Sequence, residues 1–408
     1  MFDTIIAYNN KQQAGMANFN TEAFKNELIR ILDYWEKYSK DNEHGGYYGQ
    51  VGYDNQPDPN AARSIVLNAR ILWTFSMAHR IFKEVNYLTL ADRAFQSIVK
   101  NFIDQEHGGA FWSVSPNGSP LETKKQVYGN AFAIYGLSEY YRITNHKPAL
   151  EAAQNIYQLI EKHAFDTEKG GYLEAFSQDW TPTEEYILSS APWIKSMNTH
   201  LHLVEAYTNL YSVWPDDQLK QQTKNMLLMI QKHIINSKTN SMQLFFDKNW
   251  KPKDTKISYG HDIEASWLLM ETAEILHDPD LIETTKAIAI KMAHAVEPGL
   301  AADGALNYEL DPVTNHLNTE RSWWVLAEQM VGFYNAYQIT GEEHFKRKSE
   351  KSWDYINSKF MDNTHGEWHG YVTPEGKPKL ASKINFWKGP YHNARACAEM
   401  MRRISKEN

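Results

Sequence analysis

A short motif recurs six times along the 408-residue chain at a nearly constant spacing. Weaker copies lie at 240–246, 302–308 and 363–369, and the clearest copies are Asn42-Glu-His-Gly-Gly-Tyr-Tyr48, Gln105-Glu-His-Gly-Gly-Ala-Phe111 and Thr167-Glu-Lys-Gly-Gly-Tyr-Leu173. The first glycine or its counterpart stands at positions 45, 108, 170, about 241, 304 and 366, so the intervals are 63, 62, about 71, 63 and 62. Six copies at such intervals indicate six similar structural units that cover nearly the whole chain.

Each unit has the same order of local signals: a helical stretch, a polar turn with Gly-Gly and a few extended aromatic residues, then another helical stretch. The pattern predicts helices near 21–40, 62–82, 86–102, 124–143, 147–163, 197–212, 217–235, 260–277, 280–296, 321–340, 343–360 and 388–405. Twelve helices in six hairpins can close into an (α/α)6 barrel with short strands in the long loops at one end, whereas an open array would need polar capping repeats. No linker or charge block divides the chain, so we expect one all-α domain over residues 1–408.

Net charge, hydropathy and cysteine content indicate which kinds of binding partner and which location to expect. The formal net charge is -8, which argues against nucleic acid and anionic membrane surfaces. No apolar run approaches the ~20 residues that span a bilayer, and the start of the sequence shows no leader pattern. Cys397 is the single cysteine, which suits a reducing compartment. We therefore expect a cytoplasmic monomer that acts on a small molecule.

Chemically unusual residues collect where the second helix of each hairpin is predicted to begin. All six starts would face one end of the barrel, and the first helices of the hairpins carry no comparable set, which predicts a single pocket. The stretches concerned are Asn68-Ala-Arg70, Lys124-Lys-Gln-Val-Tyr128, Met197-Asn-Thr-His-Leu-His202, Ser258-Tyr-Gly-His-Asp-Ile-Glu-Ala-Ser-Trp267, Arg321-Ser-Trp-Trp324 with Glu328, and Asn385-Phe-Trp-Lys-Gly-Pro-Tyr-His392.

The stretch that ends at Trp267 places His261 at a helix start. Its Tyr-Gly pair indicates a turn and Asp262 can cap the helix that follows. The helix macrodipole disfavours a cationic imidazole there, so His261 would stay neutral and able to accept a proton. Glu264 follows three residues later on a neighbouring part of the helix face. The alternative is an ordinary His/Glu pair above a core tryptophan.

Two further histidines share this logic. His392 follows Gly-Pro, which suits the first turn of a helix, and could approach a ligand from the side opposite His261; two capped histidines with packing roles are the alternative. Asn198 and His202 lie four residues apart and share a helix face, whereas His200 points elsewhere. We therefore predict His202 in the pocket and His200 in a structural position.

Four of these motifs, in this order, resemble those of the N-acylglucosamine 2-epimerase superfamily, and within it those of the cellobiose 2-epimerases. The resemblance rests on 198–202, 260–267, 323–328 and 386–393 and extends from about residue 21 to 405. It implies an (α/α)6 barrel that inverts C2 of an unmodified reducing-end sugar without a metal or other cofactor. It also implies catalytic roles for His261 and His392 as the acid/base pair, with Arg70 and His202 beside them, and sugar contacts by Tyr128, Asn198, Glu264, Trp267, Trp324, Glu328 and Trp387.

The implied chemistry suits these residue types. A C2 proton is acidic only when C1 is a carbonyl, so the ring must open before a histidine removes it. Arg70 can stabilise the resulting cis-enediolate, and proton return to the opposite face completes the inversion. We expect β-1,4-linked disaccharides such as cellobiose or lactose, with glucose converted to mannose, because Trp112 and Trp387 could stack a second ring.

Two departures from the family pattern bear on the substrate. Leu326 stands where relatives commonly have glutamine, and 186–195 lacks an expected acidic residue near the pocket rim. Trp193 could instead close the space for a second sugar ring. A monosaccharide epimerase or isomerase of the same superfamily, acting on mannose and glucose or on N-acylglucosamine, is therefore the alternative.

Three more distant alternatives stay open. An inverting glycosidase on the same fold would need two carboxyl groups on either side of a glycosidic bond. A non-catalytic sugar-binding protein could keep the pocket without the reaction. A metal enzyme could use His202, His261, Glu264 and His392, although no short two-histidine motif on one helix face supports it.

Overall fold

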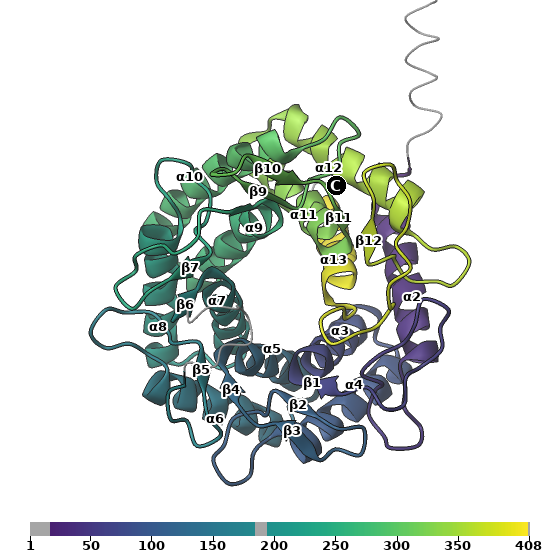
Figure 1. Ribbon diagram of the computed structural model, residues 1–408, viewed down its shortest axis with the longest axis vertical. Coiled ribbons are helices and arrows are strands. Elements are labelled where there is room, and N and C mark those ends of the chain that lie inside the picture. The colour runs from purple at the N-terminus through teal and green to yellow at the C-terminus, as the bar shows by residue number, and fades with distance from the viewer. Residues whose placement is uncertain (1–16, 184–193, 407–408) are drawn as a thin grey trace, which may run out of the picture.

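Two concentric rings of helices form the molecule in the computed structural model, which describes residues 17–183 and 194–406 (Figure 1). Within the described residues the outer ring consists of α2 (Thr21–Tyr38), α4 (Val85–Ser97), α6 (Lys147–His163), α8 (Asp217–Met229), α10 (Pro279–Val296) and α12 (Glu343–Tyr355). The inner ring consists of α3 (Ile65–Phe82), α5 (Val127–Thr144), α7 (Met197–Tyr211), α9 (Tyr259–Leu276), α11 (Trp323–Thr340) and α13 (Tyr391–Ser405). The predicted (α/α)6 barrel is confirmed.

The two rings differ in how their helices are buried. In α2 the buried residues Phe24, Leu28, Ile31 and Leu32 recur at helical spacing, and the opposite face is solvated. In α3 every residue from Ile65 to Ala78 is buried, because an inner helix packs against both ring neighbours and an outer helix. A polar side chain on an inner helix must therefore find a partner or face an internal cavity.

The ring closes between the ends of the chain. The last helix, α13, packs against α2 and α3 of the first hairpin and against α11. The C-terminal helix therefore completes the inner wall that α3 begins.

Long loops precede the inner helices and carry short antiparallel strands. The strand before an inner helix commonly pairs with a strand of the following loop, as in β1–β2, β4–β5, β6–β7, β8–β9 and β11–β12. The strands are β1 (Arg63–Ser64), β2 (Ser113–Val114), β3 (Pro120–Glu122), β4 (Lys125–Gln126), β5 (Ala175–Phe176), β6 (Lys195–Ser196), β7 (Phe245–Phe246), β8 (Ile257–Ser258), β9 (Glu309–Asp311), β10 (His316–Asn318), β11 (Arg321–Ser322) and β12 (Tyr371–Val372). Connections from inner to outer helices are short, so the inner helices all begin at the strand-bearing end, as predicted.

Backbone conformation explains why glycine recurs in the Gly-Gly turns. Gly108 and Gly109 have φ of 69° and 70°, in the left-handed region that favours glycine, and the Gly108 N–H donates to the carbonyl four residues earlier. Asn240 has φ of 56° and makes the same backbone bond to Asn236. The counterpart in the fourth unit is therefore Asn240, one residue before the position predicted.

Helix boundaries agree with the predictions to within three residues, with one qualification in the outer ring. The last turn of three predicted helices is a π turn: η1 (Ile98–Phe102) after α4, η2 (Ile230–Ile234) after α8 and η4 (Ile356–Phe360) after α12. A 3₁₀ turn, η3 (Glu297–Gly299), follows α10. Across the described part of the chain, no helix combines the length and apolar character needed to cross a bilayer.

Candidate active site

A cavity of about 580 Å³ lies among the starts of the inner helices. Every inner helix contributes to its wall, and the long loops supply the rest. The lining residues are Gln50, Arg70, Tyr128, Asn198, His202, His261, Glu264, Tyr308, Trp323, Trp324, Tyr371, Asn385, Phe386, Trp387 and His392. The structure thus brings together all predicted site residues except Trp267 and Glu328.

His261 lies in the first turn of α9, but the local structure differs from the prediction. The helix begins at Tyr259 with Ser258 as its N-cap residue, and the Asp262 carboxylate instead accepts the N–H of Met242 at 2.7 Å. Gly260 is helical, and a Cβ there would lie 2.6 Å from the Trp324 ring. The predicted Tyr-Gly turn and Asp262 cap are therefore wrong: glycine is required for close packing of two inner helices.

The environment of His261 keeps its ring neutral. Burial lowers its pKa to about 3, and the nearby His202 lowers it as well. Ser258 Oγ lies 2.7 Å from His261 Nδ1, and the ring packs on Trp324 with centroids 4.6 Å apart. With Nδ1 engaged by Ser258, Nε2 is the ring nitrogen available to a ligand.

His392 lies in the first turn of α13, after Pro390, and packs on the same tryptophan at 5.7 Å. Its Nδ1 is 2.7 Å from Glu328 Oε1, and because an ionised carboxylate only accepts, Nδ1–H donates and Nε2 keeps its lone pair. Burial, together with Arg70 and Arg395, holds the pKa of His392 well below its usual range. Two neutral histidines therefore contact the same Trp324 ring at the cavity wall.

Arg395 connects three carboxylates beneath the cavity. Its Nη2 lies 2.7 Å from both Glu264 Oε1 and Glu328 Oε1, and its Nη1 donates to Glu205 Oε1. The guanidinium also packs over the Trp267 ring at 4.7 Å. One guanidinium thus bonds to three buried acids, from α7, α9 and α11.

The three acids are not equivalent. Burial opposes ionisation of Glu205, but Arg395 and His202 outweigh it and lower the pKa of Glu205 to about 2. Burial and the neighbouring Glu328 raise the pKa of Glu264 well above its usual range. Glu264 Oε2 has no hydrogen-bond partner among the described residues and Glu264 lines the cavity. A protonated Glu264 can therefore donate a hydrogen bond to a ligand.

Arg395 also bears on the metal-enzyme alternative. Ligand atoms of Glu264, Glu328 and His392 lie within 4.8 Å of one another, but the guanidinium already bonds to both carboxylate oxygens. In the described part of the chain, no ligand cluster adds His202 or His261 to this group. An organic cation occupies the position that a metal ion would need.

The two histidines of α7 lie in different environments, as predicted. His202 lines the cavity, and its Nδ1 lies 2.9 Å from Glu205 Oε2. His200 is fully buried; its Nδ1 lies 2.6 Å from the Ser196 carbonyl and its Nε2 accepts the Tyr172 N–H at 2.9 Å. Both nitrogens of His200 are used in holding the loop before α7, so only His202 can meet a ligand.

Arg70 belongs to α3, next to α13, and its guanidinium lies 5.2 Å from the Tyr391 ring centroid. Its Nη1 donates to the Trp387 carbonyl and its Nη2 to the Tyr128 hydroxyl at 3.2 Å, while the guanidinium lies over the Phe132 ring at 4.5 Å. Its Nε is buried without a hydrogen-bond partner in the described residues. The planar group is held in place by rings and loop backbone.

Known proteins that resemble this chain match it over most of its length. The model of the family described as N-acylglucosamine 2-epimerase (GlcNAc 2-epimerase) matches residues 46–396. The chain belongs to this family. Its predicted class, an isomerase acting as a carbohydrate epimerase, is thereby confirmed.

Individual relatives extend this match. A cellobiose 2-epimerase of Bacteroides fragilis is 42% identical over 383 residues, covering 93% of this chain and 98% of the relative. One of Dictyoglomus turgidum is 37% identical over 387 residues, covering 94% and 98%. The solved structure of cellobiose 2-epimerase from Bacillus thermoamylovorans B4167 has a TM-score of 0.90 and 38% identity, covering 94% of this chain and 99% of that chain.

Two residues predicted to bind substrate do not line the cavity of this epimerase. Glu328 lies behind His392, and Trp267 lies behind Glu328 and donates from Nε1 to its Oε2 at 3.0 Å. Glu328 is the sixth residue of α11, the same depth at which Arg70, His202 and Glu264 reach the cavity on their helices. The His392 ring from the neighbouring helix covers it. Trp267, the ninth residue of α9, lies about one turn deeper.

At the loop end, Trp387 is 39% exposed and lines the cavity, whereas Trp112 is 4% exposed and packs behind it at 5.6 Å. Trp112 therefore supports Trp387 and presents no free face to a sugar. Leu326 is fully buried in the core and is absent from the lining, so this departure from the family pattern does not touch the cavity. Trp193 lies outside the described residues.

Several lining residues of the epimerase were not predicted, and the repeat contains a signal for some of them. Gln50 and Tyr371 each follow the first glycine of their unit by five residues, and Tyr308 follows its glycine by four. Glu205 and Arg395 follow His202 and His392 by three residues, as Glu264 follows His261. That shared spacing places a charged residue one turn below each histidine.

Arg70→Lys is expected to lower kcat/KM for epimerisation by about 10²-fold or more, because an ammonium cannot replace the planar, multiply hydrogen-bonded group. The measurement is steady-state kinetics beside a thermal unfolding scan. Arg93→Lys is a matched control, since Arg93 also donates to loop carbonyls but lies outside the cavity lining. Near-normal kinetics for Arg70→Lys would make Arg70 a structural residue of α3.

Proposed function

We propose that this epimerase inverts C2 of the reducing-end aldose of β-1,4-linked disaccharides such as cellobiose or lactose, interconverting glucose and mannose ends. The observation that carries the proposal is the pair of neutral histidines, His261 and His392, in contact with one Trp324 ring and lining one cavity with Arg70. The identity to relatives named cellobiose 2-epimerase supports the disaccharide. We further propose a monomeric cytoplasmic enzyme that needs no cofactor.

The reaction begins with ring opening. The C1–O5 bond breaks as the C1 hydroxyl loses a proton and the ring oxygen gains one. His202 Nε2 can take the first proton, because Glu205 holds the Nδ1 side of the ring. Glu264 can supply the second, since its raised pKa keeps a proton on a carboxyl that lines the cavity. The product is an open-chain aldehyde whose C2 proton is acidic.

Inversion then uses the two histidines in opposite senses. Nε2 of one removes the C2 proton, and the electrons form the C1–C2 double bond of a cis-enediolate. The other histidine, having received on Nε2 the proton that His202 took up in ring opening, returns it to the opposite face. Arg70 stabilises the negative oxygen in a cavity from which water is largely displaced. Glu328 orients His392 through Nδ1 and stabilises its imidazolium once a proton has been taken up. In the reverse reaction the histidines exchange roles.

The other readings have less support. An inverting glycosidase needs two free carboxyl groups about 6.5–9.5 Å apart on either side of the bond. Among the lining residues Glu264 is the acid, while Glu205 and Glu328 lie outside the lining and are bound by Arg395. A binding protein would have no use for two neutral histidines at one wall. The exposed face of Trp387 supports a second sugar ring over a monosaccharide.

The substrate assignment is tested in heavy water. With cellobiose or mannose as substrate, proton NMR should show loss of the C2 proton signal and appearance of the C2 epimer, with the higher kcat/KM for cellobiose. Trp387→Ala should lower kcat/KM for cellobiose more than for mannose. A tenfold preference for mannose, about 1.4 kcal/mol in transition-state binding, would overturn the disaccharide assignment.

Two other outcomes of this experiment are informative. Release of monosaccharide from cellobiose would favour hydrolysis over epimerisation, and no deuterium at C2 would favour a binding protein. Trp193→Ala adds a directional check: turnover of cellobiose should stay nearly unchanged if the disaccharide already fits, and should rise if that ring blocks it.

A further inference from the structure

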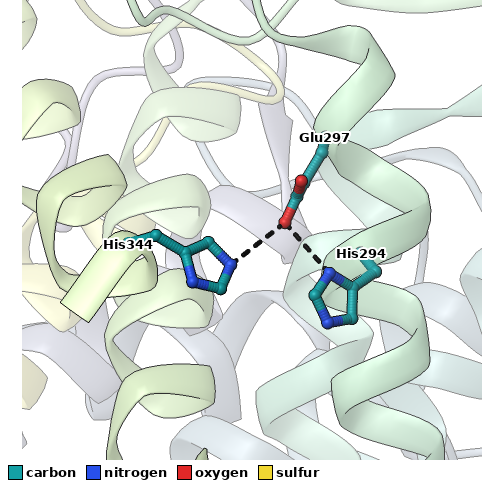
Figure 2. A group of neighbouring side chains, drawn as sticks. All are labelled: His294, Glu297 and His344. Atoms are coloured by element: carbon teal, nitrogen blue, oxygen red, sulfur yellow. Dashed lines mark hydrogen bonds and ion pairs between the residues drawn. The ribbon is translucent and has the colours of Figure 1, made fainter. Parts of the chain in front are cut away.

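A second group of histidine and carboxylate side chains lies on the outer ring, apart from the barrel cavity. His294 belongs to α10, Glu297 begins η3, and His344 lies in α12 (Figure 2). Glu297 Oε1 lies 3.1 Å from His294 Nδ1 and 3.5 Å from His344 Nε2, and the three ligand atoms are within 4.8 Å of one another. We propose that this group, here called the outer histidine cluster, binds one zinc ion.

The distances suit a tetrahedral ion. With zinc bonds of about 2.0–2.1 Å, ligand atoms in a tetrahedron lie about 3.3 Å apart. The two measured distances to Glu297 Oε1 lie on either side of that value. Both imidazole rings turn toward this carboxylate oxygen in Figure 2, and they are nearly parallel, with an interplanar angle of 17°. To bind the ion, His294 Nδ1 and His344 Nε2 would have to move closer to each other. Water can complete the coordination because the cluster lies at the surface.

The surroundings also fit zinc ligation. His344 Nδ1 lies 3.3 Å from Glu342 Oε2, so Nδ1–H donates to a carboxylate and Nε2 keeps its lone pair on the side of Glu297. A carboxylate on the far ring nitrogen is the usual partner of a metal-bound histidine. Two imidazoles with one carboxylate favour zinc or a neighbouring transition metal over magnesium or calcium, which prefer oxygen ligands.

Lys348 is the group that zinc must displace. Its Nζ lies 2.9 Å from Glu297 Oε1. The second oxygen of the same carboxylate can accept from Lys348 while Oε1 binds the ion, and a water molecule fits the fourth position.

Such an ion would join two hairpins. The end of α10 and the start of α12 belong to the fifth and sixth hairpins, and the cluster shares no residue with the cavity lining. An ion that binds only the folded chain shifts unfolding to higher temperature by mass action. Zinc at this position would therefore stabilise the ring without entering the epimerisation chemistry.

The test uses the full chain, freed of metal with a chelator and then titrated with zinc chloride. Calorimetry should give one ion per chain, and thermal unfolding should move to higher temperature. Glu342→Gln should weaken zinc binding by about 10-fold or more, and His344→Ala and His294→Ala by more than that. His316→Ala is the matched control, because it removes an exposed histidine of β10 and should leave zinc affinity unchanged.

Two results would overturn the proposal. One is a zinc dissociation constant weaker than about 1 mM with no shift in unfolding temperature. The other is zinc binding that survives His344→Ala and disappears in His392→Ala, which would place the ion in the barrel. A variant that unfolds before titration is replaced by His344→Gln, which retains polarity without an imidazole. None of these readouts depends on the sugar reaction.

Discussion

His261→Ala and His392→Ala are each expected to lower kcat for epimerisation by about 10²- to 10⁴-fold, the usual contribution of an acid/base group. Each variant removes one of the two imidazoles that must exchange a proton with C2, on opposite faces of the sugar. Both side chains line a cavity, so their loss leaves the packing of the inner ring largely intact. The measurement is C2 proton exchange by NMR, with circular dichroism to check helix content.

A histidine at the other end of the same helix serves as control. His277 is the C-cap residue of α9, with φ of 54°, and asparagine tolerates that left-handed conformation. His277→Asn should retain wild-type turnover. If His261→Ala or His392→Ala kept more than about a tenth of wild-type kcat, the two-histidine mechanism would be wrong. Retention in only one of them would point to a single base with a different proton donor.

Arg395→Met is expected to lower the free energy of unfolding by about 3–5 kcal/mol at neutral pH, because it leaves buried carboxylates without their cation. Methionine keeps an unbranched apolar chain against the Trp267 and Tyr391 rings. The loss in free energy of unfolding therefore reflects the missing charge more than the change in side-chain volume. Denaturant unfolding measures it. Arg402→Met is the control: Arg402 bonds to Glu399, which also binds Arg403, and its side chain is 42% exposed. A loss below about 1 kcal/mol is expected there.

The pH dependence of the free energy of unfolding of Arg395→Met tests whether the loss of charge causes the lower stability. Without the guanidinium, the pKa of Glu205 is no longer held at about 2, and the pKa values of Glu264 and Glu328, already raised in the wild type, rise further. The deficit against wild type is small near pH 2, where the carboxyls are largely protonated in both states. It grows as pH rises through 4.5 toward neutrality, because the wild type gains stability from ionised Glu205 while the variant resists ionisation. Arg395→Met with Glu264→Gln should recover part of the loss. A deficit independent of pH would refute the charge explanation.

The fold could be predicted because one signal was repeated six times. Each Gly-Gly turn reflects a left-handed backbone that few other residues adopt, and an outer helix such as α2 has a clear apolar periodicity. Errors were confined to features that depend on contacts between units. The π turns after α4, α8 and α12 have no signal in local periodicity, and Gly260 was mistaken for a turn residue because the Trp324 ring against it belongs to another helix.

The site was predictable to the depth of about two helical turns. Polar residues near the start of an inner helix either reach the cavity, as His261 does, or bond to the backbone of a neighbouring loop, as His200 and Asp262 do. Deeper along an inner helix, the position of a residue in the sequence does not by itself decide whether its side chain reaches the cavity. Glu328 and Glu264 are both sixth in their helices, yet His392 covers only Glu328. Arg395 was missed although it follows His392 by three residues, because its partners come from three other helices.

Closure of the ring by α13 has a consequence for biosynthesis. This helix follows all the other helices of the two rings in sequence order and supplies both His392 and Arg395. The hairpins synthesised earlier therefore emerge with Glu205, Glu264 and Glu328 already in place and the guanidinium that binds them still to come. N-terminal segments can fold during translation, but the interior of this barrel cannot be neutralised until α13 has been synthesised and has left the ribosome. A prematurely terminated product would carry the carboxylates without their counter-ion, and so would be a ready substrate for quality control.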